Sequence, residues 1–126
     1  MPKLAVASRN VAKPANPFSL GIKANGFLFV SGQVGKNKQG KIVEGFSAQV
    51  EQALENLRAI LSEGGCSMED VVKVTVYVTD IAQMKELNDV YRRYFSEPYP
   101  ARATVEVSRL GLTAEVEIEA VALCAN

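Results

Sequence analysis

The sequence predicts an α/β (α+β) domain in which one mixed β-sheet carries two helices on one face. Two segments have the apolar spacing of amphipathic helices, and the segments around them have the alternating, β-branched pattern of strands. Strands precede, separate and follow the two helices, so the expected order is β-β-β-α-β-α-β-β. The chain has 126 residues without a linker or repeat, and we expect a single domain over residues 1–126.

Two of the three strands before the first helix can be placed. Residues 4–8 form a short candidate, and Gly26–Ser31 is a nearly continuous apolar run typical of a strand buried on both faces. Between them, Pro14 and Pro17 predict a turn or an extended connection, because proline fixes its own φ and restrains the residue before it. The polar stretch over residues 35–40 predicts an exposed hairpin loop.

The longer helix is expected over residues 47–63 and ends at Gly64–Gly65, since glycine readily adopts the conformation that terminates a helix. Its apolar stripe consists of Val50, Ala53, Leu54, Leu57, Ile60 and Leu61. A second helix is expected after Asp80 and continues to about Ser96. Asp80 is its expected N-cap, and Gln83 stands where a capping box would place the reciprocal partner.

Three further strands, over residues 71–79, 101–108 and 115–123, complete the sheet. Period two predicts that one face is apolar and includes Val72, Val74, Val76 and Val78. The opposite face is then expected to carry Lys73, Thr75, Tyr77, Arg102, Thr104, Glu106, Glu115, Glu117 and Glu119. We expect the helices to cover the apolar face. The polar face is either solvated or an interface between subunits that contains polar pockets.

The composition excludes several classes of function. There is no histidine, so the chain has no Ser-His-Asp triad, Cys-His pair or HExxH zinc site. The 14 Lys and Arg residues balance 14 Asp and Glu residues, which argues against a nucleic-acid or membrane-surface partner. The sequence shows neither a signal-peptide core nor an apolar run near the ~20 residues of a membrane helix. We therefore expect a soluble, cytoplasmic protein.

The two cysteines, Cys66 and Cys124, lack the spacing of a zinc cluster. Cys66 follows two glycines in a loop and is expected to be incidental rather than nucleophilic, while Cys124 falls on the apolar side of the last strand. Their spacing leaves a disulfide between them open. In an intracellular protein we expect reduced thiols, and we expect no metal or cofactor.

Two charged residues are candidates for chemistry. Arg102 begins a strand, where it is either a solvated surface charge or a clamp for a carboxylate, because guanidinium offers planar, bidentate hydrogen bonds. Glu117 lies mid-strand between two other acids. It is either solvated, or it faces a partly enclosed site where burial and its neighbours raise its pKa and prepare it for proton transfer.

Four segments together resemble the RidA/YjgF family of enamine/imine deaminases over nearly the whole chain. They are Phe27–Gln33, Val72–Val78, the Asn88–Tyr91 segment with Tyr94–Phe95, and Pro100–Val107 followed by Val116–Ala122. The resemblance implies a chorismate-mutase-like subunit in a homotrimer, with sites between subunits. It also implies that the arginine of P-A-R, Arg102, binds the substrate carboxylate and that the first glutamate of V-E-I-E, Glu117, handles water.

The implied reaction is hydrolytic deamination of reactive 2-imino or enamine acids, such as those from 2-aminoacrylate, to 2-keto acids and ammonia. This chemistry protects other enzymes from damage. The expected partners are therefore small 2-imino or 2-keto carboxylates. Besides the catalytic pair, the expected substrate-binding residues are Phe18, Ser31, Gly32, Met84, Asn88 and Thr104.

The chain departs from the family pattern at several positions. Phe18 stands where tyrosine is frequent, Thr104 where cysteine is common, and Gly111 where the family usually has proline; Met84 holds a place that is often aromatic. The missing phenolic hydroxyl at Phe18 favours an alternative function, a non-catalytic trimer that binds small carboxylates in a sensing or regulatory role. A third possibility, an RNA-directed nuclease, is opposed by the zero net charge and the lack of histidine.

Overall fold

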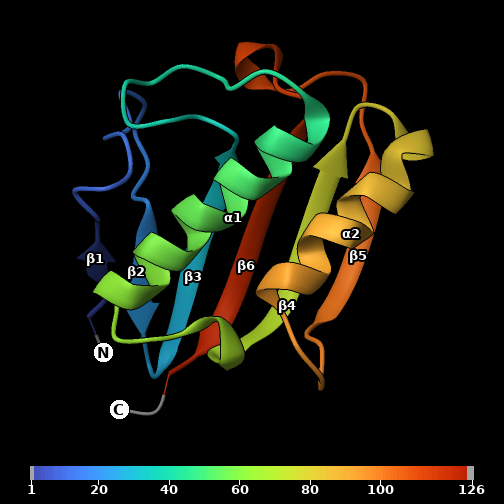
Figure 1. Ribbon diagram of the computed structural model, residues 1–126. Helices are drawn as coiled ribbons and strands as arrows, with labels where there is room; N and C mark the ends of the chain where they lie inside the picture. Colours follow the sequence, from blue (N-terminus) through green and yellow to red (C-terminus); the bar gives the residue numbers. More distant parts are fainter. Residues whose placement is uncertain (1, 125–126) are drawn as a thin grey trace.

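One six-stranded sheet, covered on one face by two helices, forms the architecture (Figure 1). The computed structural model describes residues 2–124. Its strands are β1 (Leu4–Val6), β2 (Gly21–Ala24), β3 (Phe27–Val34), β4 (Val71–Val78), β5 (Ala101–Glu106) and β6 (Val116–Leu123). The helices are α1 (Phe46–Glu63) and α2 (Met84–Tyr94), with 3₁₀ turns η1 (Met68–Asp70), η2 (Ile81–Gln83) and η3 (Gly111–Thr113). The expected fold class and element order are confirmed.

The sheet has the strand order β1-β2-β3-β6-β4-β5, and only the β4–β5 pair is parallel. The strand that the sequence left unplaced is β2. It joins β3 through Asn25 and Gly26, whose φ angles of 54° and 86° are those of a tight two-residue hairpin. β3 extends beyond Ser31 to Val34, through a register shift between Val30 and Gln33.

The core lies between the helices and the sheet. The predicted stripe of α1 is confirmed, since all six of its residues are buried. On β4 the prediction for Val72 is wrong: its side chain is 44% exposed, while Val71 is buried. The register between β4 and β6 shifts between Val71 and Lys73, and this bulge turns Val72 outward.

The start of the second helix agrees with the predicted cap. The Oδ1 atom of Asp80 accepts a hydrogen bond of 3.0 Å from the backbone N–H of Ala82, which begins η2 and leads directly into α2. Within residues 2–124 the Gln83 side chain returns no hydrogen bond to Asp80, so the capping box is incomplete. α2 ends at Tyr94 rather than near Ser96, because Phe95 is already extended, with φ −122° and ψ 148°.

The strand faces differ from the sequence prediction at four polar residues. Because β5 pairs in parallel with β4, Arg102 and Thr104 lie beside the buried Val74 and Val76 and therefore on the helix-covered face. Glu106 follows on that face, where its carboxylate accepts a hydrogen bond of 2.9 Å from the Ile81 N–H. Glu115 also turns toward the helices and accepts a hydrogen bond of 3.3 Å from the Gln49 side chain. The expectation that these four residues share the open face is wrong.

The open face of the sheet carries exposed apolar side chains together with polar groups that include Glu117 and Glu119. Neither helix covers it, as Figure 1 shows. Its large exposed apolar side chains are Phe27, Phe29, Val105 and Leu123. Phe27, Phe29 and Leu123 lie together on β3 and β6, and an exposed apolar patch of this kind is typical of a contact with another protein. Among the described residues, no helix has the length and apolar character needed to cross a membrane.

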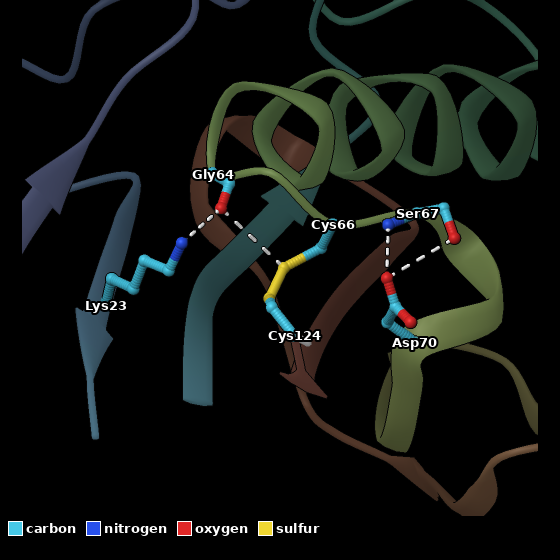
Figure 2. Close-up of a disulfide and its surroundings, with 6 residues drawn as sticks. All are labelled: Lys23, Gly64, Cys66, Ser67, Asp70 and Cys124. Carbon is cyan, nitrogen blue, oxygen red and sulfur yellow. Dashed lines mark hydrogen bonds between the residues drawn. A yellow bond between two sulfur atoms is a disulfide. The ribbon is translucent and has the colours of Figure 1, made fainter. Parts of the chain in front are cut away.

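Cys66 and Cys124 form a disulfide that ties the loop after α1 to the end of β6 (Figure 2). Their Cα atoms are 5.3 Å apart, within the range of a normal disulfide, and both residues are buried. The expectation of reduced thiols is therefore wrong for this structure. Beside the disulfide, the ammonium group of Lys23 donates a hydrogen bond of 2.8 Å to the Gly64 carbonyl at the end of α1.

Candidate functional site

Arg102 lies between β5 and α2, at a cavity of about 290 Å³. Its Nη2 atom donates a hydrogen bond of 2.9 Å to the side-chain oxygen of Asn88 and lies 3.8 Å from the sulfur of Met84. Its guanidinium carbon is 4.7 Å from the centre of the Tyr91 ring. Within the described part of the chain, Arg102 has no carboxylate partner. The arrangement suits an anionic ligand, because a half-buried guanidinium retains unpaired N–H groups.

The helix α2 brings three of these partners to the arginine. Met84, Asn88 and Tyr91 are spaced by four and then three residues, and side chains at this spacing share one face of a helix. Met84 and Asn88 were predicted from the family pattern. Tyr91 was named as part of the Asn88–Tyr91 segment but was not predicted as a site residue, although its spacing from Asn88 was a signal that it faces the same neighbour.

Thr104 follows Arg102 on the same face of β5, two residues along the strand. Its hydroxyl oxygen is buried and has no hydrogen-bond partner among the described residues. A buried hydroxyl without a partner is costly, and Thr104 therefore stands out among the residues beside Arg102. The structure therefore brings four predicted residues together at this site: Met84, Asn88, Arg102 and Thr104.

Glu117 lies on the other face of the sheet, at a second cavity of about 220 Å³ that also borders Phe18, Gly32 and Leu112. Its carboxyl group lies directly over Gly32. A Cβ atom built on Gly32 would be 2.7 Å from the carboxyl carbon of Glu117, which is closer than side-chain atoms approach each other. Gly32 is thus required for the close approach of the glutamate, and the predicted Phe18, Gly32 and Glu117 meet here.

Ser31 supports this second cavity through contacts within the chain. Its hydroxyl donates a hydrogen bond of 2.6 Å to the Ser19 carbonyl, and its backbone N–H donates one of 2.9 Å to the Leu20 carbonyl. Its own carbonyl accepts a hydrogen bond of 3.0 Å from the Gln33 side chain. These bonds fix the segment that carries Phe18 against the bulge of β3.

The electrostatic environment of Glu117 favours its protonated form. Burial raises the pKa of the Glu117 carboxyl above its usual value, and the negative charge of Glu119 on the same face raises it further. The hydroxyl of Tyr77 donates a hydrogen bond of 3.2 Å to Glu119 and thereby holds that carboxylate in place. Burial and the same carboxylate also raise the pKa of Tyr77, so its phenol keeps its proton.

Replacing Glu119 with glutamine is expected to lower the pKa of Glu117. The carboxyl of Glu117 would then lose its proton at a lower pH, because a neighbouring negative charge no longer opposes ionisation. The measurement is a carbon-13 NMR titration of the Glu117 side chain. Glu115→Gln is the matched control, since Glu115 turns toward Gln49 on the other side of the sheet. An unchanged Glu117 titration in Glu119→Gln would contradict the assigned cause.

One copy of the chain does not bring Arg102 and Glu117 together. The first lies on the helix-covered face and the second on the open face, with the sheet between them. We therefore distinguish an arginine half-site (Met84, Asn88, Tyr91, Arg102 and Thr104) from a glutamate half-site (Phe18, Gly32 and Glu117). No group of three His, Cys, Asp or Glu residues within residues 2–124 is arranged to hold a metal ion.

Comparison with known proteins identifies the chain. The family model described as endoribonuclease L-PSP matches residues 8–124. A RutC family protein of Aquifex aeolicus is 53% identical over 113 residues, which cover 87% of this chain and 90% of that protein. The chain belongs to the RidA/YjgF family. The resemblance inferred from the four sequence segments is thus confirmed.

Other RidA/YjgF relatives carry more specific names. A protein of Salmonella typhimurium named 2-iminobutanoate/2-iminopropanoate deaminase is 36% identical over 122 residues, covering 94% of this chain and 95% of its own length. The crystal structure of Escherichia coli TdcF with bound serine superposes with a TM-score of 0.92 at 32% identity, covering 97% of this chain and 99% of that one. These likenesses extend over the strands and the helix that carry both half-sites.

Proposed function

We propose that this protein hydrolyses reactive 2-imino acids and their enamine tautomers to 2-keto acids and ammonia. The observation that carries the proposal is Arg102, a half-buried guanidinium oriented by Asn88 and left without a carboxylate partner in the described chain. The name of the Salmonella relative and the serine bound to TdcF support the same ligand class, a small molecule with a carboxylate. In this role the protein works in the cytoplasm and protects other enzymes from imine damage.

The proposed active site lies between two subunits of a homotrimer. Arg102 and Glu117 lie on opposite faces of the sheet, so a site that uses both needs the arginine half-site of one copy and the glutamate half-site of another. The open face offers apolar surface for such a contact, including Phe29 and Leu123, which are 46% and 50% exposed. A head-to-tail contact of this kind closes into a ring, and three copies are expected from the family.

Arg102 binds and orients the substrate in this mechanism. Two of its N–H groups donate to the carboxylate, while the bond to Asn88 keeps the guanidinium plane fixed. The electrophilic C2 carbon is then held at a defined position relative to the partner's glutamate half-site. Fixing the carbon in this way lowers the entropic part of the barrier to attack by water.

Glu117 handles water and protons in the following steps. As a carboxylate it accepts a proton while the oxygen of the water forms a bond to C2 of the protonated imine. It then returns this proton to the nitrogen of the tetrahedral intermediate. As the C–N bond breaks and ammonia leaves, the hydroxyl on C2 gives its proton to the Glu117 carboxylate and becomes the carbonyl of the 2-keto acid, and Glu117 finally releases that proton to the departing ammonia. The raised pKa of Glu117 suits the first step, because it makes the carboxylate a stronger base toward the attacking water.

The remaining predicted residues shape the pocket. Phe18 provides an apolar wall on the glutamate side and Met84 one on the arginine side. Thr104 lies beside Arg102 on the same face of β5, and its buried hydroxyl has no partner among the described residues. Ser31 acts through the segment that carries Phe18 rather than through free hydrogen-bond groups of its own side chain.

A subunit-mixing experiment tests this proposal. Arg102→Ala and Glu117→Gln chains are each expected to clear 2-aminoacrylate, generated by a serine dehydratase, no faster than buffer. Equal amounts of the two chains are then unfolded and refolded together. One site in four receives an intact Arg102 and an intact Glu117 from neighbouring subunits, so about one quarter of the wild-type activity is expected to return. A mixture without activity would contradict a shared site.

The imine assay, combined with measurements of pyruvate binding and RNA cleavage, separates the deaminase from the two alternative functions. A wild-type protein that binds pyruvate in calorimetry but does not accelerate imine loss is a carboxylate-binding trimer, the function favoured by Phe18 without its hydroxyl. The description of the matching family model names an endoribonuclease, and the zero net charge of this chain argues against RNA binding. RNA cleavage that persists through stringent purification and disappears in Glu117→Gln would replace the deaminase proposal.

A further inference from the structure

The ring of Tyr91 lies against the guanidinium of Arg102. The guanidinium carbon is 4.7 Å from the ring centre, a distance at which a cation is attracted to the electron-rich face of an aromatic ring. We propose that Tyr91 is a positioning residue, whose ring holds Arg102 in the orientation that binds the substrate carboxylate. This inference rests on the proposed function, and it adds a residue and a role to the arginine half-site.

Tyr91 is itself immobilised by the core. It is only 5% exposed, and its ring packs against that of Phe95 with ring centres 4.5 Å apart. Phe95 is likewise only 5% exposed. A ring fixed on both sides is a rigid support, so the guanidinium loses little further freedom when a ligand binds.

The ring and Asn88 constrain different motions of the arginine. Contact with the ring face limits the tilt of the guanidinium plane, and the 2.9 Å hydrogen bond from Nη2 to Asn88 limits its rotation within that plane. The hydrogen bond to Asn88 uses one end of the guanidinium group and leaves its other N–H donors for a planar carboxylate. The two partners come from the same helix, three residues apart, and therefore act as one rigid support.

The hydroxyl of Tyr91 does not explain why the residue is there. It is buried and makes no well-aligned hydrogen bond with the described residues. Burial raises the pKa of Tyr91 to about 12, against the opposing effects of the Arg102 charge and of hydrogen bonding from the Arg102 side chain, so the phenol stays neutral. A buried hydroxyl without a well-aligned hydrogen bond contributes little, and we expect its removal to be tolerated. The aromatic ring is accordingly the part of Tyr91 that acts on Arg102.

The chain offers a matched control on the same helix. Tyr94 also lies beneath an arginine, with the guanidinium carbon of Arg58 at 5.0 Å from its ring centre. That pair faces α1, where the Tyr94 hydroxyl donates a hydrogen bond of 2.8 Å to Glu55 and Arg58 forms an ion pair with the same carboxylate. Tyr94→Leu therefore removes an aromatic ring and a cation–π contact from α2 without touching the arginine half-site.

The test compares pyruvate binding and imine turnover in the intact protein. Tyr91→Leu is expected to raise the Kd for pyruvate by about 3- to 20-fold, as loss of one cation–π contact predicts. KM for the imine rises similarly while kcat changes little, because the contact orients a binding group. Tyr91→Phe keeps the ring, and its Kd for pyruvate is expected to lie within about twofold of the wild-type value. The Kd of Tyr94→Leu is expected to lie within the same range.

The outcomes separate this inference from the function on which it rests. If Arg102→Ala abolishes pyruvate binding and folded Tyr91→Leu binds as wild type does, the positioning role is wrong and the carboxylate clamp stands. A loss in Tyr94→Leu equal to that in Tyr91→Leu would also overturn it, because the effect would then be general to the helix. If wild type neither binds pyruvate nor clears imine, the proposed function itself fails.

Discussion

Arg102→Lys is expected to lower kcat/KM for 2-iminopropanoate by about 100-fold, which corresponds to about 2.7 kcal/mol of lost transition-state stabilisation. Lysine keeps the positive charge but presents it at a single point. It cannot donate two parallel bonds to a carboxylate while also bonding to Asn88, and it lacks the planar group that lies over Tyr91. The loss of charge-assisted hydrogen bonds accounts for an effect of this size.

The measurement is the steady-state rate of imine loss over a range of substrate concentrations. Arg92→Lys is the matched control, because Arg92 borders the same cavity but is exposed and lies 3.8 Å from Asp89 in an ion pair. That variant is expected to remain within about threefold of wild type, since exposed ion pairs contribute little. Retention of full activity by Arg102→Lys would show that charge alone suffices and that the planar clamp is wrong.

The helices and most strands could be predicted because their burial is periodic. α1 buries one stripe of residues, and β4 buries alternate residues from Val74 onward. In both elements the spacing of apolar residues in the sequence matches the spacing of buried residues. β2 was missed because four residues, Gly21–Ala24, are too short for a pattern to emerge. The Asn25–Gly26 pair was the available signal, since this dipeptide favours the hairpin that joins β2 to β3.

The face of Arg102 could not be predicted from the same rule. Period two divides the residues of β5 between the two faces of the sheet. The prediction then assumed that the face with the apolar residues is the one covered by the helices. In the structure Val105 faces outward and is 41% exposed, while Arg102 and Thr104 face α2. The rule fails where the outer face is itself apolar, as expected of a strand that becomes covered in an oligomer.

The two half-sites show what the family resemblance adds to the alternating pattern of the strands. From the strands alone, Arg102 and Glu117 were expected on one face, where a single subunit would hold both. The structure separates them and shows distinct partners for each, namely Asn88 for the arginine and Gly32 for the glutamate. The proposed site shared between subunits reconciles their separation with a common substrate. The strand pattern had offered a subunit interface as one of two readings of the polar face, and the family resemblance favoured that reading.

The disulfide was beyond prediction from spacing, because Cys66 and Cys124 are 58 residues apart in the sequence. Their proximity depends on two features of the fold. α1 ends at Glu63 and the loop after it returns to the sheet, and β6 lies centrally in the sheet and ends beside that loop. Neither feature follows from the residues around the cysteines.

Removing the disulfide is expected to lower the free energy of unfolding by about 2–4 kcal/mol. The cross-link closes a loop spanning 58 positions, and loss of that constraint increases the entropy of the unfolded chain. For a domain of this size the melting temperature should fall by about 10 °C. The measurement compares urea unfolding of wild type and Cys66→Ala/Cys124→Ala at equal protein concentration, because assembly also affects apparent stability.

The design separates the cross-link from the packing of the cysteine side chains. Wild type that is unfolded and refolded in reductant should lose most of the same stability, while the double variant should be insensitive to reductant. Catalysis should survive in the folded double variant, because Cys124 follows the C-terminal end of β6 and Glu117 lies near its start, about 23 Å away along the strand. If wild type denatured without reductant contains two free thiols, the disulfide does not form. If wild type and the double variant have equal free energies of unfolding, the disulfide does not constrain the unfolded chain.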